Sequence, residues 1–93
     1  MAPRLTAADI RGALQSLPDW SLQDDKLHRV FRFADFVAAF GFMSRVALLA
    51  ERIHHHPEWS NIYRTVVIDL TTHDAAGITQ KDIDLAMAIS RLV

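Results

Sequence analysis

The chain passes from a helical pattern to an extended pattern within the run Glu51-Arg52-Ile53-His54-His55-His56-Pro57-Glu58-Trp59. Proline disfavours the α conformation in the residue before it, so Pro57 predicts that the helix ends near His54 or His55. The run also places three adjacent imidazoles at this helix end. It therefore predicts both a boundary in the fold and a cluster of groups that exchange protons near neutral pH.

Upstream of the run, the pattern predicts a long helix that begins after a capping residue, Asp35, and reaches about Ile53. Its expected core stripe consists of Phe36, Ala39, Phe40, Met43, Val46, Ala47, Ala50 and Ile53. Phe42 and Leu49 fall outside this stripe, so the helix is apolar on more than one side. We expect it to contact its own sheet on one side and another subunit on the other. A monomer whose termini cover these residues is the alternative.

Along the sequence, one predicted pair of strands precedes this helix and a second pair follows it. Residues 20–23 and 26–33 predict a hairpin that turns at Asp24-Asp25, and residues 59–63 and 65–72 predict a second pair of strands. In the first hairpin Leu27 and Phe31 lie on a mainly apolar face, and His28 lies on the opposite face. Short connections favour antiparallel pairing of all four strands.

Two shorter helices complete the pattern. Thr6 and Asp9 have the spacing of a capping box before a helix over residues 7–16, and Thr79 and Asp82 have the same spacing before a helix that reaches the C-terminus. The order αββαββα predicts an α+β fold: a four-stranded antiparallel sheet with three helices packed on one face. The length of 93 residues predicts one domain, residues 1–93.

Composition excludes several classes of protein. The formal net charge is −1, with no concentration of Lys and Arg, which argues against direct binding of nucleic acid. There are no cysteines for disulfides or thiolate metal sites, and no apolar run approaches the roughly 18 residues of a membrane span. We expect a soluble cytoplasmic domain that does not bind membranes. The hydrophobic share of 51% is compatible with subunit contacts or with a well-filled monomer core.

The histidines suggest general acid–base chemistry. Glu51 lies one helical turn before His55, close enough to orient its ring, and His73 stands where the fourth strand is expected to end. We expect these imidazoles to face one shallow pocket and to supply a proton donor and a proton acceptor. Each well-placed group of this kind contributes about 10²–10⁴ to a rate.

Less specific explanations exist for the same residues. Histidines are favoured at a helix C-terminus by the helix dipole, and Asp82 is at a position where a carboxylate caps a helix. The spacing matches no common zinc motif, so we expect no dedicated metal site. Trp59 is either a core residue or a cover for a flat ligand, and Trp20 is expected in the core. His28 and His54 are expected to be exposed and without a role.

At these residues the chain resembles the pterin-4a-carbinolamine dehydratase family, also called 4a-hydroxytetrahydrobiopterin dehydratases. The similarity rests on several spaced motifs: Glu51, His55-His56-Pro57-Glu58-Trp59, Asn61, Tyr63, Thr72-His73, Ala76-Gly77 and Asp82. The segment 40–47 is also similar, and the resemblance covers essentially the whole chain.

The resemblance implies a hydro-lyase that removes water from a 4a-hydroxytetrahydropterin and gives the quinonoid dihydropterin, in the recycling of tetrahydrobiopterin. It implies His55, His56 and His73 as catalytic residues, with Glu51 and Asp82 in support. His56, Pro57 and Trp59 are the expected contacts of the pterin. Neither a metal nor an organic cofactor is required, because no redox change occurs.

The resemblance also implies a homodimer or homotetramer and a functional link to an aromatic amino-acid hydroxylase. Animal members of the family serve in addition as a dimerisation cofactor for a homeodomain transcription factor. The alternative function is therefore a non-catalytic protein-interaction module that binds a partner through helix 35–53. Our mechanistic hypothesis is that His55, oriented by Glu51, and His73 perform the two proton transfers, while His56 mainly binds the pterin.

Overall fold

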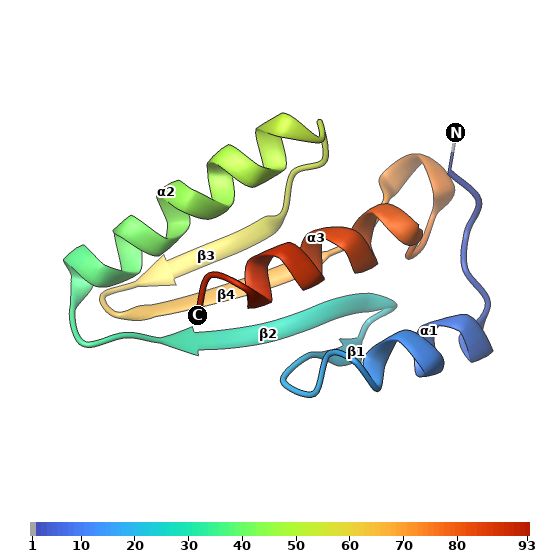
Figure 1. Ribbon diagram of the computed structural model, residues 1–93, viewed down its shortest axis with the longest axis horizontal. Helices are drawn as coiled ribbons and strands as arrows, with labels where there is room; N and C mark the ends of the chain where they lie inside the picture. Colours follow the sequence, from blue (N-terminus) through green and yellow to red (C-terminus); the bar gives the residue numbers. More distant parts are fainter. Residues whose placement is uncertain (1) are drawn as a thin grey trace.

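Residues 2–93 of a computed structural model form an antiparallel sheet with three helices on one of its faces (Figure 1). The elements follow the predicted order. They are α1 (Ala7–Leu14), β1 (Ser21–Gln23), β2 (Lys26–Arg32), α2 (Phe36–Arg52), β3 (Glu58–Ile62), β4 (Thr65–Leu70), the 3₁₀-helix η1 (His73–Ala75) and α3 (Gln80–Ser90). The expected αββαββα arrangement is confirmed.

The four strands lie in the spatial order β1-β2-β4-β3, and every neighbouring pair is antiparallel. The second hairpin therefore inserts β4 beside β2 and leaves β1 and β3 as the edges. In this register Phe31 lies opposite Val66, and Trp59 lies opposite Ile68. Because side chains alternate between the faces of a strand, these four residues share the face that the helices cover.

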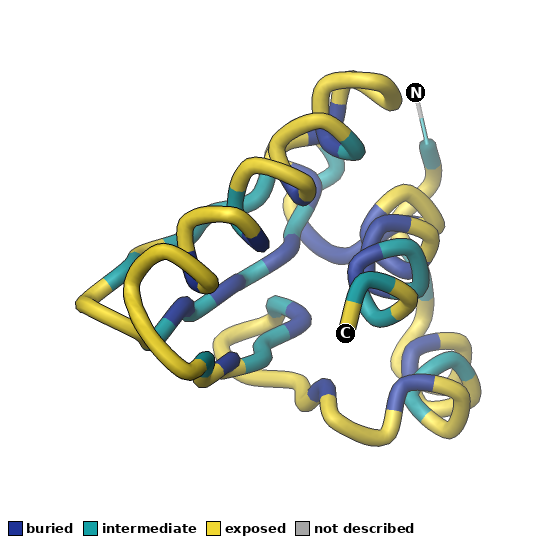
Figure 2. Tube along the Cα trace, turned by 60° about the vertical axis from the view of Figure 1, so that its left-hand side comes forward, coloured by how far each residue is buried: buried dark blue, intermediate teal, exposed yellow. Residues whose placement is uncertain are grey.

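The core lies between this face and the helices, and the tube in Figure 2 shows the buried turns of the helices directed inward. Its fully buried members come from several elements, and the largest are Phe42, Leu17, Leu27, Ile68, Leu70, Ile78, Leu85 and Ile89. Trp20 also belongs to the core, as expected, and its indole N–H donates to Ser90 Oγ at 2.9 Å. This polar contact satisfies the one donor that the buried ring carries.

The buried side of α2 differs from the predicted stripe. Ala39, Phe42, Val46 and Ala50 are its buried residues. Phe42 was expected outside the stripe, yet its ring packs 4.7 Å from that of Phe31. Conversely, the predicted stripe included four residues that are exposed: Phe36, Phe40, Ala47 and Ile53. The helix is apolar on two sides, so its periodicity alone did not identify the side that faces the sheet.

The predicted helix starts are confirmed by their capping hydrogen bonds. Asp35 accepts from the backbone N–H of Ala38 at 2.8 Å, and both Thr6–Asp9 and Thr79–Asp82 form reciprocal capping boxes. These bonds satisfy backbone donors that have no partner within the first turn of a helix. The caps matter for function because the box of α3 contains Asp82.

The N-terminal segment is attached to the loop between β4 and α3. Leu5 N–H donates to the carbonyl of Ile78 at 2.8 Å, and Arg4 forms a β-bridge with Thr79. A Cβ added at Gly77 would lie 2.7 Å from Arg4 Nε, so the Arg4 side chain packs directly over Gly77 and would have to move to admit a larger residue. Residues 2–93 contain no helix of the length and apolarity that a membrane span needs.

Candidate active site

The end of α2 turns sharply at His54. Its φ of 54° is in the left-handed region, its N–H donates to the carbonyl of Glu51, and the N–H of His55 donates to that of Ala50. These two bonds are the pattern of a Schellman motif, in which a left-handed residue ends a helix and satisfies its last carbonyls. The reversal sends the three adjacent imidazoles in different directions.

His55 turns into the protein and meets α3. Its Nε2 lies 2.5 Å from Oδ1 of Asp82, and both residues are buried. The other carboxylate oxygen of Asp82 accepts from Thr72 Oγ1 at 2.8 Å and from the backbone N–H of Thr79 at 2.9 Å. The predicted capping role of Asp82 is therefore confirmed. Oδ2 caps the helix, and Oδ1 remains available to contact His55.

The second ring nitrogen of His55 is open. Nδ1 makes no hydrogen bond within residues 2–93. In this part of the chain every buried side-chain nitrogen or oxygen has a hydrogen-bond partner, so Nδ1 is not a buried atom. Solvent or a ligand therefore reaches it. A carboxylate at Nε2 favours the tautomer with the proton on Nε2, which makes Nδ1 of the neutral ring a proton acceptor.

His56 turns the other way and pairs with Glu51. Its Nε2 lies 2.8 Å from Glu51 Oε1, and both side chains are mostly exposed. This hydrogen bond is the main cause that lowers the pKa of Glu51 below its usual value. The prediction that Glu51 orients His55 is therefore wrong: Glu51 holds His56, and Asp82 holds His55. The one-turn spacing no longer applies because the helix ends between these residues.

His73 begins η1 and pairs with Glu58 at the start of β3. Its Nε2 lies 2.6 Å from Glu58 Oε2, and Glu58 Oε1 accepts from Lys26 Nζ at 2.5 Å. The hydrogen bond from Lys26, followed by that from His73, lowers the pKa of Glu58. The same contact raises the pKa of Lys26. A sheet edge, a central strand and η1 thus meet at one carboxylate.

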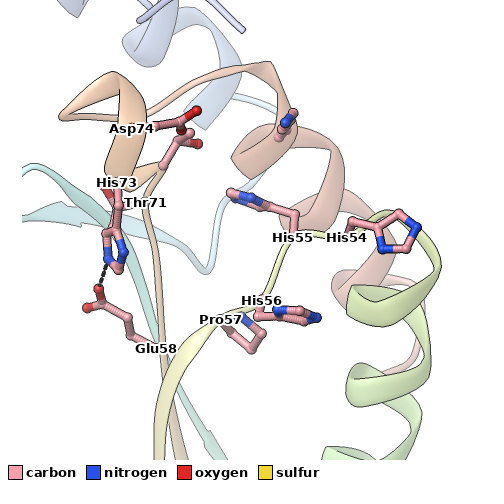
Figure 3. A pocket seen from close by; sticks show the side chains of 10 residues that line it. His54, His55, His56, Pro57, Glu58, Thr71, His73 and Asp74 are labelled. Atoms are coloured by element: carbon pink, nitrogen blue, oxygen red, sulfur yellow. Dashed lines mark hydrogen bonds and ion pairs between the residues drawn. The ribbon is translucent and has the colours of Figure 1, made fainter. Parts of the chain in front are cut away.

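The three predicted catalytic histidines line one cavity of about 500 Å³. Figure 3 shows His55 reaching in from the end of α2 and His73 from the other wall, where a dashed line joins it to Glu58. The lining residues come from the end of α2, the start of β3 and the loop after β4. They are His54, His55, His56, Pro57, Glu58, Thr71, Thr72, His73, Asp74 and Lys81.

The other predicted site residues occupy different places. Pro57 lines the cavity, whereas Glu51 and Asp82 lie behind His56 and His55. Trp59 does not line the cavity: it is on the helix-covered face of the sheet and packs against the core. The prediction that Trp59 contacts the substrate is therefore not supported by its position, and its alternative assignment to the core is.

Sequence reasoning gave no role to Glu58, Lys26, Thr72 or Lys81. Glu58 was part of the quoted motif, but its partners depend on the sheet register, in which β3 lies two strands away from β2. The alternation of Glu58 with the core residue Trp59 was the available signal, because it places Glu58 on the open face. His28, expected to be exposed, is instead half-buried on this face and pairs with Asp69 at 2.8 Å.

The three cavity histidines share one kind of contact. Each of His55, His56 and His73 has one ring nitrogen on a carboxylate. Within residues 2–93 no group of three or more His, Cys, Asp or Glu side chains is placed to hold a metal ion. Histidine–carboxylate pairs around a pocket are typical of general acid–base sites.

Comparison with known proteins assigns the chain to a family. Residues 3–92 match the family described as Pterin 4 alpha carbinolamine dehydratase. A protein of Prochlorococcus marinus (strain MIT 9303), named "Putative pterin-4-alpha-carbinolamine dehydratase", is 55% identical over 98% of this chain and 95% of its own. A protein of the same name from Rhodopseudomonas palustris (strain BisB18) is 53% identical over 99% and 93%.

A solved structure shows the same fold. It is described as a transcriptional coactivator/pterin dehydratase from Brucella melitensis. The TM-score is 0.93 at 42% sequence identity, over 96% of this chain and 97% of the other. Sequence and structure agree along nearly the whole length, and the chain belongs to the pterin-4a-carbinolamine dehydratase family.

Proposed function

We propose that this protein catalyses the loss of water from a 4a-hydroxytetrahydropterin to give the quinonoid dihydropterin. Membership of the family supports the reaction class, a hydro-lyase. The single observation that carries the mechanism is the cavity of about 500 Å³ that His55, His56 and His73 line together. Such a volume is in the range of pockets that bind small molecules.

The reaction needs two proton transfers. The C4a–O bond breaks and the hydroxyl leaves as water after it has gained a proton. The N5–H bond loses its proton, and the electron pair forms the C4a=N5 double bond. Atoms and charge balance without an oxidant or reductant, so one proton donor and one proton acceptor are sufficient.

We assign the acceptor role to His55 and the donor role to His73. The contact of His55 Nε2 with Asp82 leaves Nδ1 as the accepting atom of a neutral ring. His73 is mostly exposed and its Nε2 faces the carboxylate of Glu58, so Nδ1–H is the proposed donor and solvent can return the proton to it. His56, held by Glu51, binds the pterin together with Pro57.

The proposal is tested by the rate of carbinolamine dehydration above the spontaneous background. His55→Gln and His73→Gln should each lower kcat by about 10²–10⁴, the range for a positioned proton-transfer group. His28→Gln is the matched control, because His28 also pairs with a carboxylate but lies on the open sheet face outside the cavity.

Three results would count against the proposal. Wild-type kcat in both cavity variants would remove the proton-transfer roles. Loss of activity after chelator treatment, with recovery on addition of zinc, would favour a metal site instead. Protein without any acceleration over background would favour the non-catalytic interaction module.

An apolar side of α2 favours a second role in association. Phe36, Val37, Phe40 and Leu48 are large hydrophobic residues with exposed fractions between 48% and 78%. Val37 and Leu48 lie on the side of α2 opposite its buried residues, and Phe36 and Phe40 lie together on the adjoining flank. We propose that this side contacts a second copy of the chain, in a homodimer or homotetramer. The coactivator in the name of the Brucella melitensis structure is compatible with a protein partner on such a surface.

Sedimentation tests this contact. Phe40→Arg should shift the protein toward smaller species. Ile62→Arg is the control: it introduces the same charge on the exposed end of the edge strand β3 and should leave the assembly unchanged. An unchanged sedimentation coefficient for Phe40→Arg would rule out α2 as the contact. The link to an aromatic amino-acid hydroxylase, a role in tetrahydrobiopterin recycling and a cytoplasmic location stay predictions.

A further inference from the structure

Glu58 connects the cavity to the open face of the sheet. Its two oxygens are divided between Lys26 Nζ, at 2.5 Å, and His73 Nε2, at 2.6 Å. Lys26 begins β2, Glu58 begins β3, and His73 begins η1. Three separate elements therefore fix one carboxylate, although its side chain is 38% exposed.

The two contacts have different chemical consequences. A Lys ammonium donates hydrogen bonds and accepts none, so Lys26 always requires an acceptor oxygen on residue 58. An ionised carboxylate also accepts only, so the nitrogen of His73 that faces it must carry a proton. The pKa of Glu58 is lowered chiefly by Lys26, which favours the ionised form that this arrangement needs.

We propose that Glu58, held in place by Lys26, is a positioning residue that keeps a proton on Nε2 of His73 and so directs Nδ1 to the substrate. The role rests on the proposed dehydratase function. In the neutral ring Nδ1 then accepts a proton, and in the imidazolium Nδ1–H donates one. Glu58 does not touch the reacting atoms in this scheme; it acts through His73.

Other charged groups lie near the Glu58–His73 pair, but none of them forms a hydrogen bond with the His73 ring within residues 2–93. Asp69 of β4 lies opposite Glu58 in the sheet register and pairs with His28 of β2. Asp74, next to His73, and Lys81 of α3 line the cavity. Within residues 2–93 Glu58 is the one side chain that forms a hydrogen bond with the His73 ring.

The Glu58→Gln variant gives a sharp test because the amide has one accepting and one donating end. Lys26 requires the amide oxygen, so the NH₂ group is left facing Nε2 of His73. Nε2 must then accept, and the ring proton moves to Nδ1. We expect ¹⁵N–¹H spectra of the neutral His73 ring to change from the Nε2–H to the Nδ1–H tautomer.

The double variant Lys26→Met/Glu58→Gln should reverse part of this change. Without the lysine the amide is free to turn its oxygen to His73, so the Nε2–H tautomer returns. We expect kcat of Glu58→Gln to fall about tenfold or more, a part of what a proton-transfer group contributes, with KM changed much less. The double variant should regain activity relative to Glu58→Gln.

Asp69→Asn is the matched control, since it also removes one charge from a carboxylate paired with a histidine on the same face. It should leave the His73 tautomer unchanged. A wild-type tautomer in Glu58→Gln, or equal tautomers in the single and double variants, would overturn the proposal. Wild-type protein that does not accelerate dehydration would instead refute the proposed function, which the spectra alone do not measure.

Discussion

His55 Nε2 and Asp82 Oδ1 lie 2.5 Å apart, and this contact joins the end of α2 to the first turn of α3. The same carboxylate caps α3 through the backbone N–H of Thr79. One buried group therefore contributes to helix stability and to the orientation of the imidazole. A substitution of Asp82 is therefore expected to change both properties. They are measured separately, the imidazole orientation through kcat and the helix stability through urea denaturation.

Asp82→Asn should lower kcat far more than it lowers stability. Thr72 and Thr79 present donors to one side of the side chain, so the Asn oxygen takes that side and its NH₂ faces His55. Nε2 then accepts, and Nδ1 loses its role as the base. We expect kcat to fall by about 10²–10⁴, as for a base in the wrong tautomer.

Urea denaturation of the same variant should show a loss of about 1–3 kcal/mol, because buried hydrogen bonds to a charged group are weakened. Asp84→Asn makes the same change two residues later on the exposed side of α3 and should alter stability by less than about 0.5 kcal/mol. Full activity in Asp82→Asn would show that His55 is not the base.

His54→Gly should stabilise the protein. The left-handed conformation costs a residue with a Cβ about 1–2 kcal/mol, and glycine is free of that cost. The greater freedom of glycine in the unfolded chain offsets about half of the gain, so we expect a rise of roughly 0.5–1 kcal/mol in the free energy of unfolding.

His56→Gly is the control for this prediction, since His56 has a negative φ and glycine there should destabilise. A lower melting temperature in His54→Gly than in the wild type would contradict the assignment of strain to position 54.

Gly41→Ala and Gly12→Ala compare two exposed helix positions. A Cβ at either position meets no atom within 4 Å, so each alanine should raise monomer stability by roughly 0.5–1 kcal/mol. Gly41 lies on the apolar side of α2, one turn from Val37, whereas Gly12 is on α1. If copies associate through α2, only Gly41→Ala should change the sedimentation coefficient; equal behaviour of both variants would place the contact elsewhere.

Acid should remove the stabilising effect of Glu58. Its contacts with Lys26 and His73 lower its pKa below the ordinary value of 4.5, so their contribution is complete above that pH. The contribution is lost as the pH falls through the lowered value. Glu58→Gln should therefore be less stable than the wild type at pH 7, and the two urea midpoints should converge as the pH falls below the lowered pKa of Glu58. A constant difference between the midpoints would show that Glu58 contributes by packing and not by charge.

The features that the sequence predicted correctly are those that depend on contacts between residues close together in the chain. Capping residues such as Asp35 and Thr79 act on backbone groups within one turn, so their positions in the chain were sufficient to locate helix starts. The convergence of His55 and His73 on one cavity was also predicted, because helix ends and strand ends meet at the rim of a sheet.

The failures concern geometry that spacing does not determine. Glu51 was paired with the wrong histidine because His54 adopts a left-handed conformation without the glycine that would signal it. The role of Glu58 depends on the order of strands in space, which places Lys26 within its reach. The side of α2 that faces the sheet could not be predicted without the position of the sheet, since Phe42 and Phe40 are equally hydrophobic and only Phe42 is buried.

The attachment of Leu5 to Ile78 brings the start of the described chain close to the loop that carries His73 and Thr79 (Figure 1). A purification tag fused before residue 2 would therefore sit beside that loop and crowd the fit of Gly77 against Arg4. Recombinant protein for kinetic work is better tagged after Val93, and a comparison of cleaved with uncleaved material would reveal any interference.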